Sequence, residues 1–200
     1  MSERSLLAIV ILLVILVAGL GLFWDPDLPE RPLPVASAPA GGDFTLQSAD
    51  GPVALADFRG KAVLLFFGYT YCPDVCPTAL STAAAALNQL TAEELADVAV
   101  LFVSVDPKRD TPARLKEYAS FFHPAIVGVT GSPEAVAEVA QRYGVFYAEQ
   151  QVATAGDGYV VDHSANTYTI GRDGRLLGIL PHDAAPERVT ATIRKILHTP

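Results

Sequence analysis

The stretch AVLLFFGYTYCPDVCPTALSTAAAALNQL, residues 62–90, places an apolar run, a short turn and a helix-forming segment in immediate succession. Residues 62–67 are apolar without interruption, which is typical of a strand that is covered on both faces. The alanine-rich residues 78–90 favour a helix. Cys72 and Cys76 follow the carboxyl end of this strand, where functional groups gather in α/β sheets. The stretch therefore predicts an α/β fold with its reactive groups at that edge.

Further strands and helices are predicted on both sides of this stretch. We predict strands over 44–46, 52–55, 98–105, 125–129, 166–170 and 176–180, helices over 111–122, 132–143 and 186–197, and a loop over 148–158. Thr111 and Ser132, each followed by proline, favour helix starts, and Gly144 favours a helix end. The alternation of strands and helices, closed by a hairpin and a helix, predicts a central mixed β-sheet flanked by helices.

The N-terminal run LLAIVILLVILVAGLGLFW, residues 6–24, contains no charged residue. A helix that rises about 1.5 Å per residue over this length can roughly cross a ~30 Å hydrocarbon layer. Arg4 precedes the run and acidic residues follow it, which favours a cytoplasmic N-terminus. We expect a transmembrane anchor over 1–24, a proline- and alanine-rich linker over 25–42, and a folded domain over 43–200 outside the cytoplasm.

A cleaved signal peptide is the alternative for the N-terminus. The sequence Ala36-Ser37-Ala38 has the small-x-small form of a cleavage site. It lies more than ten residues beyond the apolar run, which is farther than usual. The apolar run is also longer than a usual signal-peptide core, so the uncleaved anchor is the preferred interpretation.

The net charge of −8 limits the classes of partner. Nucleic-acid binding needs a basic patch, and an acidic chain is a poor candidate for it. The sequence therefore predicts no nucleic-acid partner.

The two cysteines of the chain, Cys72 and Cys76, are four residues apart. A disulfide between them would close almost no loop, so a purely structural bridge has little to stabilise. If a helix begins at Cys72, both side chains lie on one helix face, about 5–6 Å apart at Cβ. A metal with ~2.3 Å thiolate bonds spans that separation, and a helix N-terminus favours the thiolate form. An inert bridge and two buried thiols remain the alternatives.

Histidine is the natural third ligand, and the sequence contains His123, His163, His182 and His198. His163 lies between the predicted polar loop and the next strand, where spacing alone allows either metal binding or a structural hydrogen bond. Two thiolates and one imidazole suit Cu(I), although a catalytic type of zinc site stays open. Asp74 and Asp162 are the nearest candidates for an additional oxygen ligand, with a solvated surface role as the alternative for each.

Three segments resemble the Sco/SenC family of copper-binding assembly proteins: GYTYCPDVCP at 68–77, FVSVDPKRDTP at 102–112, and VVDHSANTYTIGRDG at 160–174. The resemblance runs from about residue 43 to the C-terminus. It implies a thioredoxin-like fold that binds copper, as Cu(I) or as Cu(II), through Cys72, Cys76 and His163. Asp106 and Pro107 match the family's DP segment, and the resemblance implies that they support the site rather than bind the metal.

The same resemblance implies a metallochaperone that delivers copper to the CuA centre in subunit II of cytochrome c oxidase or to another periplasmic acceptor. Its expected location is the inner membrane of a bacterium, with the soluble domain in the periplasm beside thiol–disulfide reductants and copper donors. The alternative is a dedicated thiol–disulfide reductase in which Cys72 and Cys76 form the catalytic redox pair. A thiol peroxidase is disfavoured because Tyr69 occupies the position where that chemistry relies on threonine.

Overall fold

The structure, a computed structural model, describes residues 3–23, 39–151 and 158–199. The chain divides into two compact units, Met1–Ala36 and Ser37–Pro200. The linker predicted over 25–42 lies largely outside the described residues.

Helix α1, Glu3–Phe23, covers most of the N-terminal apolar run. In the part of the chain that the structure describes, no helix combines the length and the apolar character needed to cross a membrane. The predicted transmembrane helix over 1–24 therefore has no support from the structure.

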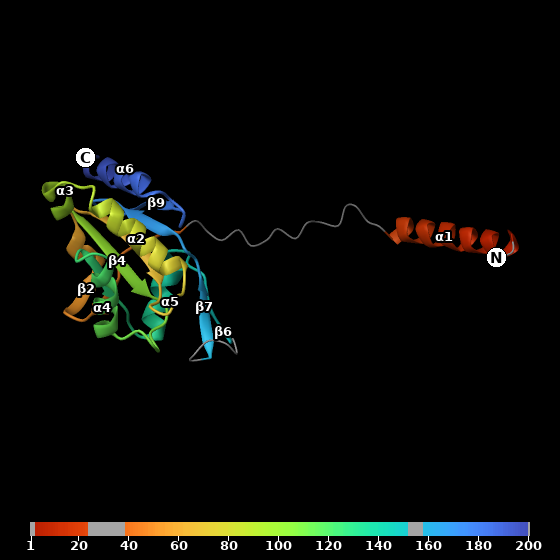
Figure 1. The fold of residues 1–200 in the computed structure, drawn as a ribbon, viewed down its shortest axis with the longest axis horizontal. Helices are drawn as coiled ribbons and strands as arrows, with labels where there is room; N and C mark the ends of the chain where they lie inside the picture. The colour runs from red at the N-terminus through yellow and green to blue at the C-terminus, as the bar shows by residue number, and fades with distance from the viewer. Residues whose placement is uncertain (1–2, 24–38, 152–157, 200) are drawn as a thin grey trace. The chain divides into compact units, whose positions relative to one another are not determined.

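A five-stranded sheet with the order β5-β4-β3-β8-β9 forms the centre of the second unit (Figure 1). Its strands are β3 Ala62–Gly68, β4 Val98–Ser104, β5 Ile126–Val129, β8 Thr167–Ile170 and β9 Leu176–Leu180. Strands β3, β4 and β5 are parallel, whereas β8 runs antiparallel to both β3 and β9. The predicted mixed sheet is confirmed, and the strand that carries the cysteine motif at its end is central.

The helices of this unit are η1 Leu55–Phe58, α2 Val75–Leu87, α3 Ala92–Ala96, α4 Pro112–Phe122, α5 Pro133–Arg142 and α6 Pro186–Leu197. Helix α2 lies between α4 and α6 and contacts both (Figure 1). Because β3, α2, β4, α4 and β5 form two successive parallel crossovers of the same hand, α2 and α4 cover the same face of the sheet.

Alternate side chains of β3 enter two different apolar layers. Phe66 stacks on Phe102, which in turn contacts Tyr118 of α4. Phe67 points to the opposite face and packs against Tyr143 and Tyr168. The strand is buried on both faces along its whole length, as its uninterrupted apolar sequence predicts.

The local signals for helix ends are confirmed. Thr111 Oγ1 accepts a hydrogen bond from Arg114 N, and Ser132 Oγ accepts one from Ala135 N, so each caps the helix that follows. Gly144 follows α5 with φ +64°, a left-handed conformation that glycine adopts without strain.

Two short hairpins stand beside the main sheet. Strands β1, Thr45–Ser48, and β2, Gly51–Ala54, form the predicted N-terminal hairpin. Strands β6, Tyr147–Gln151, and β7, Tyr159–His163, form a second antiparallel pair. The loop prediction over 148–158 is therefore wrong for its first residues, while 152–157 lie outside the described chain. Most of β6 is exposed, so its sequence lacks the apolar alternation that signals a strand.

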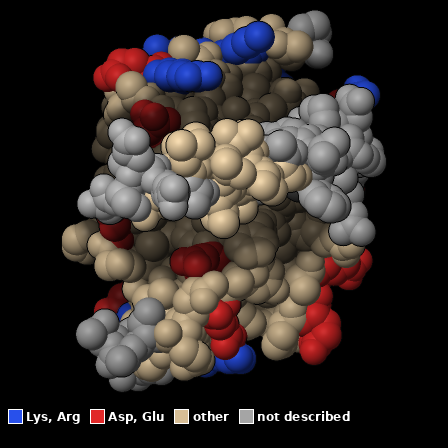
Figure 2. All heavy atoms as spheres, turned by 90° about the vertical axis from the view of Figure 1, so that its right-hand side faces the viewer, with Lys and Arg blue, Asp and Glu red and all other residues tan. Residues whose placement is uncertain are grey.

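Basic side chains are unevenly placed on the face that Figure 2 shows. Most Lys and Arg side chains in this view gather at the upper edge, the end where α6 lies in Figure 1. Asp and Glu side chains are spread over the whole view, the upper left edge included. Basic charge on this face is thus concentrated near the C-terminal helix, whose last turn carries Arg194 and Lys195.

Candidate metal centre

The two cysteines are held by different elements. Helix α2 begins at Val75, so Cys76 lies in its first turn while Cys72 lies in the preceding turn. The prediction that both cysteines share a helix face is wrong. Residues 69–72 instead close a turn of their own, in which Cys72 N donates a hydrogen bond to Tyr69 O. Helix α2 begins three residues after Cys72 and three residues before the alanine-rich segment 78–90.

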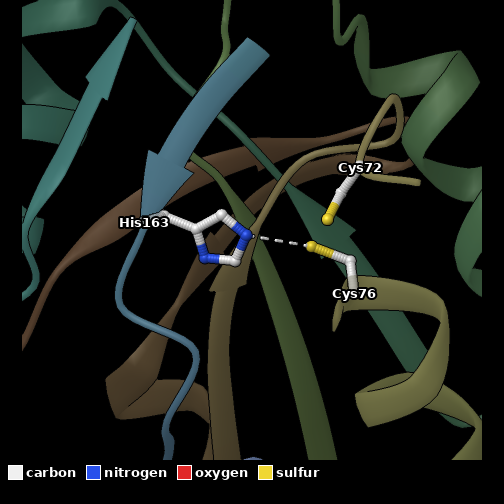
Figure 3. A group of neighbouring side chains, drawn as sticks. All are labelled: Cys72, Cys76 and His163. Atoms are coloured by element: carbon white, nitrogen blue, oxygen red, sulfur yellow. Dashed lines mark hydrogen bonds between the residues drawn. The ribbon is translucent and has the colours of Figure 1, made fainter. Parts of the chain in front are cut away.

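The sulfurs nevertheless converge with the side chain of His163, the last residue of β7 (Figure 3). One ligand atom from each of Cys72, Cys76 and His163 lies within 4.8 Å of the others. The Cys76 Sγ–His163 Nε2 distance is 3.3 Å. Both cysteines are free thiols; Cys72 retains 8% of its exposure and Cys76 none, while His163 is half-buried. The cluster thus opens to solvent through Cys72 and His163.

A backbone carbonyl fixes the tautomer of His163. Its Nδ1 lies 3.1 Å from Ser164 O. A carbonyl oxygen can only accept a hydrogen bond, so Nδ1 carries the proton and donates it. Nε2 is left as the ring atom that faces the two sulfurs. The rings of Phe66 and Tyr69 meet the imidazole edge-on, with centroids at 6.2 and 5.8 Å, and hold its plane.

The two thiols have opposite acidities. The side chain of Cys76 is the main cause that lowers the pKa of Cys72 to about 3, against the opposing effect of burial, and the backbone of Asp74 and Cys76 adds smaller contributions in the same direction as Cys76. A hydrogen bond with Cys72, together with burial, raises the pKa of Cys76. Cys72 is therefore a thiolate at neutral pH, and Cys76 holds the proton that a metal ion would displace.

The donor atoms fit a three-coordinate metal ion. Metal–sulfur bonds of ~2.3 Å and a metal–nitrogen bond of ~2.0 Å at about 120° place the sulfurs about 4.0 Å apart and each sulfur about 3.7 Å from the nitrogen. All three atoms already lie within 4.8 Å of one another, so shifts of about 1 Å or less suffice. Two thiolates and one imidazole favour a soft ion over Mg²⁺ or Ca²⁺.

Glycine at position 68, which has no side chain, allows Cys76 to lie close to β3. A Cβ at this position would lie 2.5 Å from Cys76 Sγ and 2.9 Å from the ring of Phe102. Both contacts are shorter than side-chain packing permits, so the buried sulfur depends on glycine here. Gly68 was not among the predicted site residues, because its only signal in the sequence is a glycine at the end of a buried apolar strand.

Asp110 anchors the turn that precedes Cys72. Its fully buried carboxylate accepts hydrogen bonds from Thr70 N at 2.9 Å, Thr70 Oγ1 at 2.6 Å and Ser104 Oγ at 2.7 Å. Three donors satisfy a buried charge that would otherwise be costly. The end of β4 and the cysteine turn are thereby joined.

Asp106, implied as a supporting residue by the sequence resemblance, is also buried. Its carboxylate accepts hydrogen bonds from Arg109 Nε at 2.5 Å and from the Tyr159 hydroxyl at 2.9 Å. Sequence reasoning did not identify Arg109 or Tyr159, because the contact joins segments about fifty residues apart.

The other predicted candidates lie elsewhere. His123 Nδ1 accepts a hydrogen bond from Ala125 N, so this side chain supports the end of α4. His182 and His198 are exposed. Asp74 and Asp162 are exposed as well and lie outside the cluster of ligand atoms. Of the four histidines, His163 alone joins the cysteines among the residues that the structure describes.

The model of the SCO1/SenC family matches residues 34–198. A SCO2-like protein of Rickettsia conorii is 35% identical over 193 residues, which cover 93% of this chain and 94% of that protein. The solution structure of apo Sco1 from Thermus thermophilus is 46% identical, covers 80% of this chain and 92% of its own, and superposes with a TM-score of 0.72. The structure of Bradyrhizobium japonicum ScoI with copper bound is 38% identical and covers 79% of this chain and 99% of its own. It also superposes with a TM-score of 0.72.

These similarities extend over the fold and over the segments that carry the cysteines and His163. They confirm the thioredoxin-like fold that the sequence resemblance implies. The chain belongs to the SCO1/SenC family.

Proposed function

We propose that this protein binds one copper ion through Cys72, Cys76 and His163. The observation that carries the proposal is the convergence of these three donors within 4.8 Å, with Nε2 of the histidine turned toward the sulfurs. Two thiolates and one imidazole match the preference of Cu(I) for few, soft ligands. The family relative from Bradyrhizobium japonicum, described with copper bound, supports the choice of metal.

Delivery of the ion follows from the uneven burial of its ligands. Cys72 is the more accessible thiolate and His163 is half-buried, so an acceptor can reach the ion from this side. Transfer then proceeds by ligand exchange, in which each bond to an acceptor ligand replaces one bond to this chain. The proposed acceptor is the CuA centre in subunit II of cytochrome c oxidase or another periplasmic copper protein.

Attachment to the inner membrane through residues 1–24, with the domain in the periplasm, stays part of the proposal. It is supported by the uncharged sequence of residues 6–24 and by the charges that flank it. Carbonate extraction of membranes tests it: an anchored protein stays in the pellet, and release into the supernatant would contradict the anchor.

Copper titration of the reduced full-length chain under anaerobic conditions tests the site. We expect one Cu(I) per chain, with two sulfurs and one nitrogen around it by X-ray absorption. His163→Ala and Cys72→Ser should each weaken binding by at least an order of magnitude. Unchanged affinity in His163→Ala would remove this histidine from the ligand set.

Reduction of a partner disulfide is a second candidate, favoured by the unequal acidities of the two thiols. The Cys72 thiolate would attack one sulfur of the partner disulfide and release the other as a thiolate. Cys76 would then lose its proton and attack Cys72, which frees the second partner sulfur. The partner gains two electrons and the Cys72–Cys76 pair is oxidised, so a dithiol reductant must restore it. The test is reduction of a disulfide-bonded acceptor peptide. Reduction by the wild type that is lost in Cys76→Ala would support this reaction, and no reduction of the peptide by the reduced wild type would exclude it.

A further inference from the structure

The strand that carries His163 does not belong to the central sheet. Strand β7 pairs only with β6 among the described strands, in a separate two-stranded sheet. The cysteines, in contrast, follow β3 at the centre of the main sheet. The distance between His163 and the sulfurs is therefore not fixed by the backbone hydrogen bonds of that sheet, and other contacts must set it.

Arg109 makes such contacts with both sides. Its guanidinium lies 3.7 Å from the ring centroid of Tyr159 on β7, and its Nη1 donates to Tyr159 O at 3.1 Å. Toward the cysteine turn, the same guanidinium lies 4.8 Å from the ring centroid of Tyr71 and 5.6 Å from that of Tyr69. One largely buried cation thus bridges the strand that ends at His163 and the residues that precede Cys72.

Asp106 closes this arrangement. One carboxylate oxygen accepts from Arg109 Nε and the other from the Tyr159 hydroxyl. The Asp106 side chain retains 1% of its exposure and that of Arg109 retains 11%. The Asp106 carboxylate is thus bonded through both oxygens, whereas Arg109 Nη2 is buried without a hydrogen-bond partner. Charge-assisted hydrogen bonds of this kind make the arrangement geometrically specific. We call the three residues Arg109, Asp106 and Tyr159 the clasp.

We propose that the clasp positions His163 against Cys72 and Cys76 and thereby sets the copper affinity of the site. This inference rests on the proposed copper site and adds a positioning role for Arg109, whose guanidinium packs on residues flanking the ligands. Partners that orient metal ligands typically change metal affinity by about 10- to 100-fold when removed. The clasp acts through His163, so its contribution requires the imidazole.

Two substitutions loosen the clasp without leaving the Asp106 charge alone. Arg109→Lys keeps a cation beside Asp106 but loses the planar stacking and the fork of donors. Tyr159→Leu keeps the Arg109–Asp106 pair and removes the ring and hydroxyl. Arg114→Lys is the matched control, because Arg114 contacts Tyr71 and Thr70, which both lie on the cysteine side.

The measurement is Cu(I) affinity of the reduced full-length chain, by competition with a chromogenic chelator. Arg109→Lys and Tyr159→Leu should each bind about tenfold or more weakly, and Arg114→Lys within about threefold of wild type. X-ray absorption of the two clasp variants should show a weaker nitrogen contribution. Unchanged affinity in both clasp variants, or an equal loss in Arg114→Lys, would overturn the clasp.

A double-mutant cycle separates positioning from a general loss of stability. In the His163→Ala background, Arg109→Lys and Tyr159→Leu should change Cu(I) affinity by less than about twofold. A full tenfold loss in that background would show that Arg109 does not act through His163. The absence of Cu(I) binding by the wild type would contradict the proposed function. Cu(I) binding that is weakened by His163→Ala but not by the clasp variants would contradict only the role of the clasp.

Discussion

Cys76 Sγ lies so close to β3 that position 68 accommodates no side chain. A Cβ there would come within 2.5 Å of the sulfur, and the ring of Phe102 blocks the other direction at 2.9 Å. Because Cys76 is fully buried, the sulfur has little room to retreat. The position of the Cys76 sulfur, one of the proposed ligand atoms, therefore depends on glycine at position 68.

We predict that Gly68→Ala displaces the Cys76 sulfur. Overpacking of this kind costs about 1–3 kcal/mol of unfolding free energy, and the displaced ligand should lower Cu(I) affinity about tenfold. Gly178→Ala is the control, since a Cβ there meets only Thr169 Oγ1 at an ordinary 3.5 Å. Denaturant unfolding and chelator competition measure the two effects. Equal unfolding free energies and equal Cu(I) affinities of Gly68→Ala and Gly178→Ala would contradict the close contact between position 68 and Cys76.

A second prediction concerns the protonation of Cys72. Its pKa is lowered from 9.0 to about 3, mainly by the hydrogen bond from Cys76. The reduced, metal-free protein should therefore keep one thiolate as the pH falls from about 9 to about 5 and lose it only near 3. Absorbance of the thiolate near 240 nm follows this titration. In Cys76→Ala the main donor is gone, so the midpoint should rise by at least one pH unit; a wild-type midpoint above about 7 would refute the assignment.

Among the helices and strands, the elements that were predicted correctly have local signals in the sequence. Thr111 and Ser132 precede their helices by one residue, and each accepts a backbone N–H that the helix leaves unpaired. The run of residues 62–67 needs only its own composition to identify a buried strand. Strand β6 was missed because an exposed two-stranded pair has no apolar face to reveal its period.

We predict that Ser132→Ala lowers the unfolding free energy by about 1 kcal/mol, because the Ala135 N–H at the start of α5 loses its acceptor. Ser81→Ala in the exposed part of α2 is the control and should be neutral or slightly stabilising, since alanine is the better helix former. Urea unfolding of the reduced protein gives both values. A loss in Ser81→Ala as large as that in Ser132→Ala would exclude the capping explanation.

At the scale of the whole molecule, the proposed ligands come from two parts of the fold that are far apart in the sequence. Cys76 and His163 are separated by 87 residues, with the strands β4, β5 and β6 between them and His163 at the end of β7. A metal ion that binds both would cross-link the hairpin β6–β7 to the end of β3. Binding to the folded state alone must then raise its stability.

We therefore predict that Cu(I) raises the melting temperature of the reduced protein. At a free ion concentration of about 1,000 times Kd the gain is about 4 kcal/mol, or roughly 8–16 °C for a domain of this size. Differential scanning calorimetry with buffered Cu(I) measures the shift. His163→Ala should show a much smaller shift under the same conditions, whereas a full shift in that variant would contradict the cross-link.

The α/β class, the mixed sheet, most helix and strand positions, and the two cysteines at the end of a buried strand could all be predicted from the amino-acid sequence. These features depend on periodicity, composition and contacts between near neighbours, which the chain carries locally. Spacing alone left His163 undecided, and the resemblance to a family, rather than geometry, made it a ligand candidate.

The assembly of the site depends on contacts that are visible only in the folded protein. The tertiary structure moved Cys72 off the helix, oriented His163 through the carbonyl of Ser164, and brought Arg109 between β7 and the cysteine turn. The contact between Arg109 and Tyr159 joins residues that are 50 apart in the sequence, a separation that no local periodicity predicts. Its physical basis is the packing of the hairpin β6–β7 beside the central sheet, which no local pattern of residues encodes.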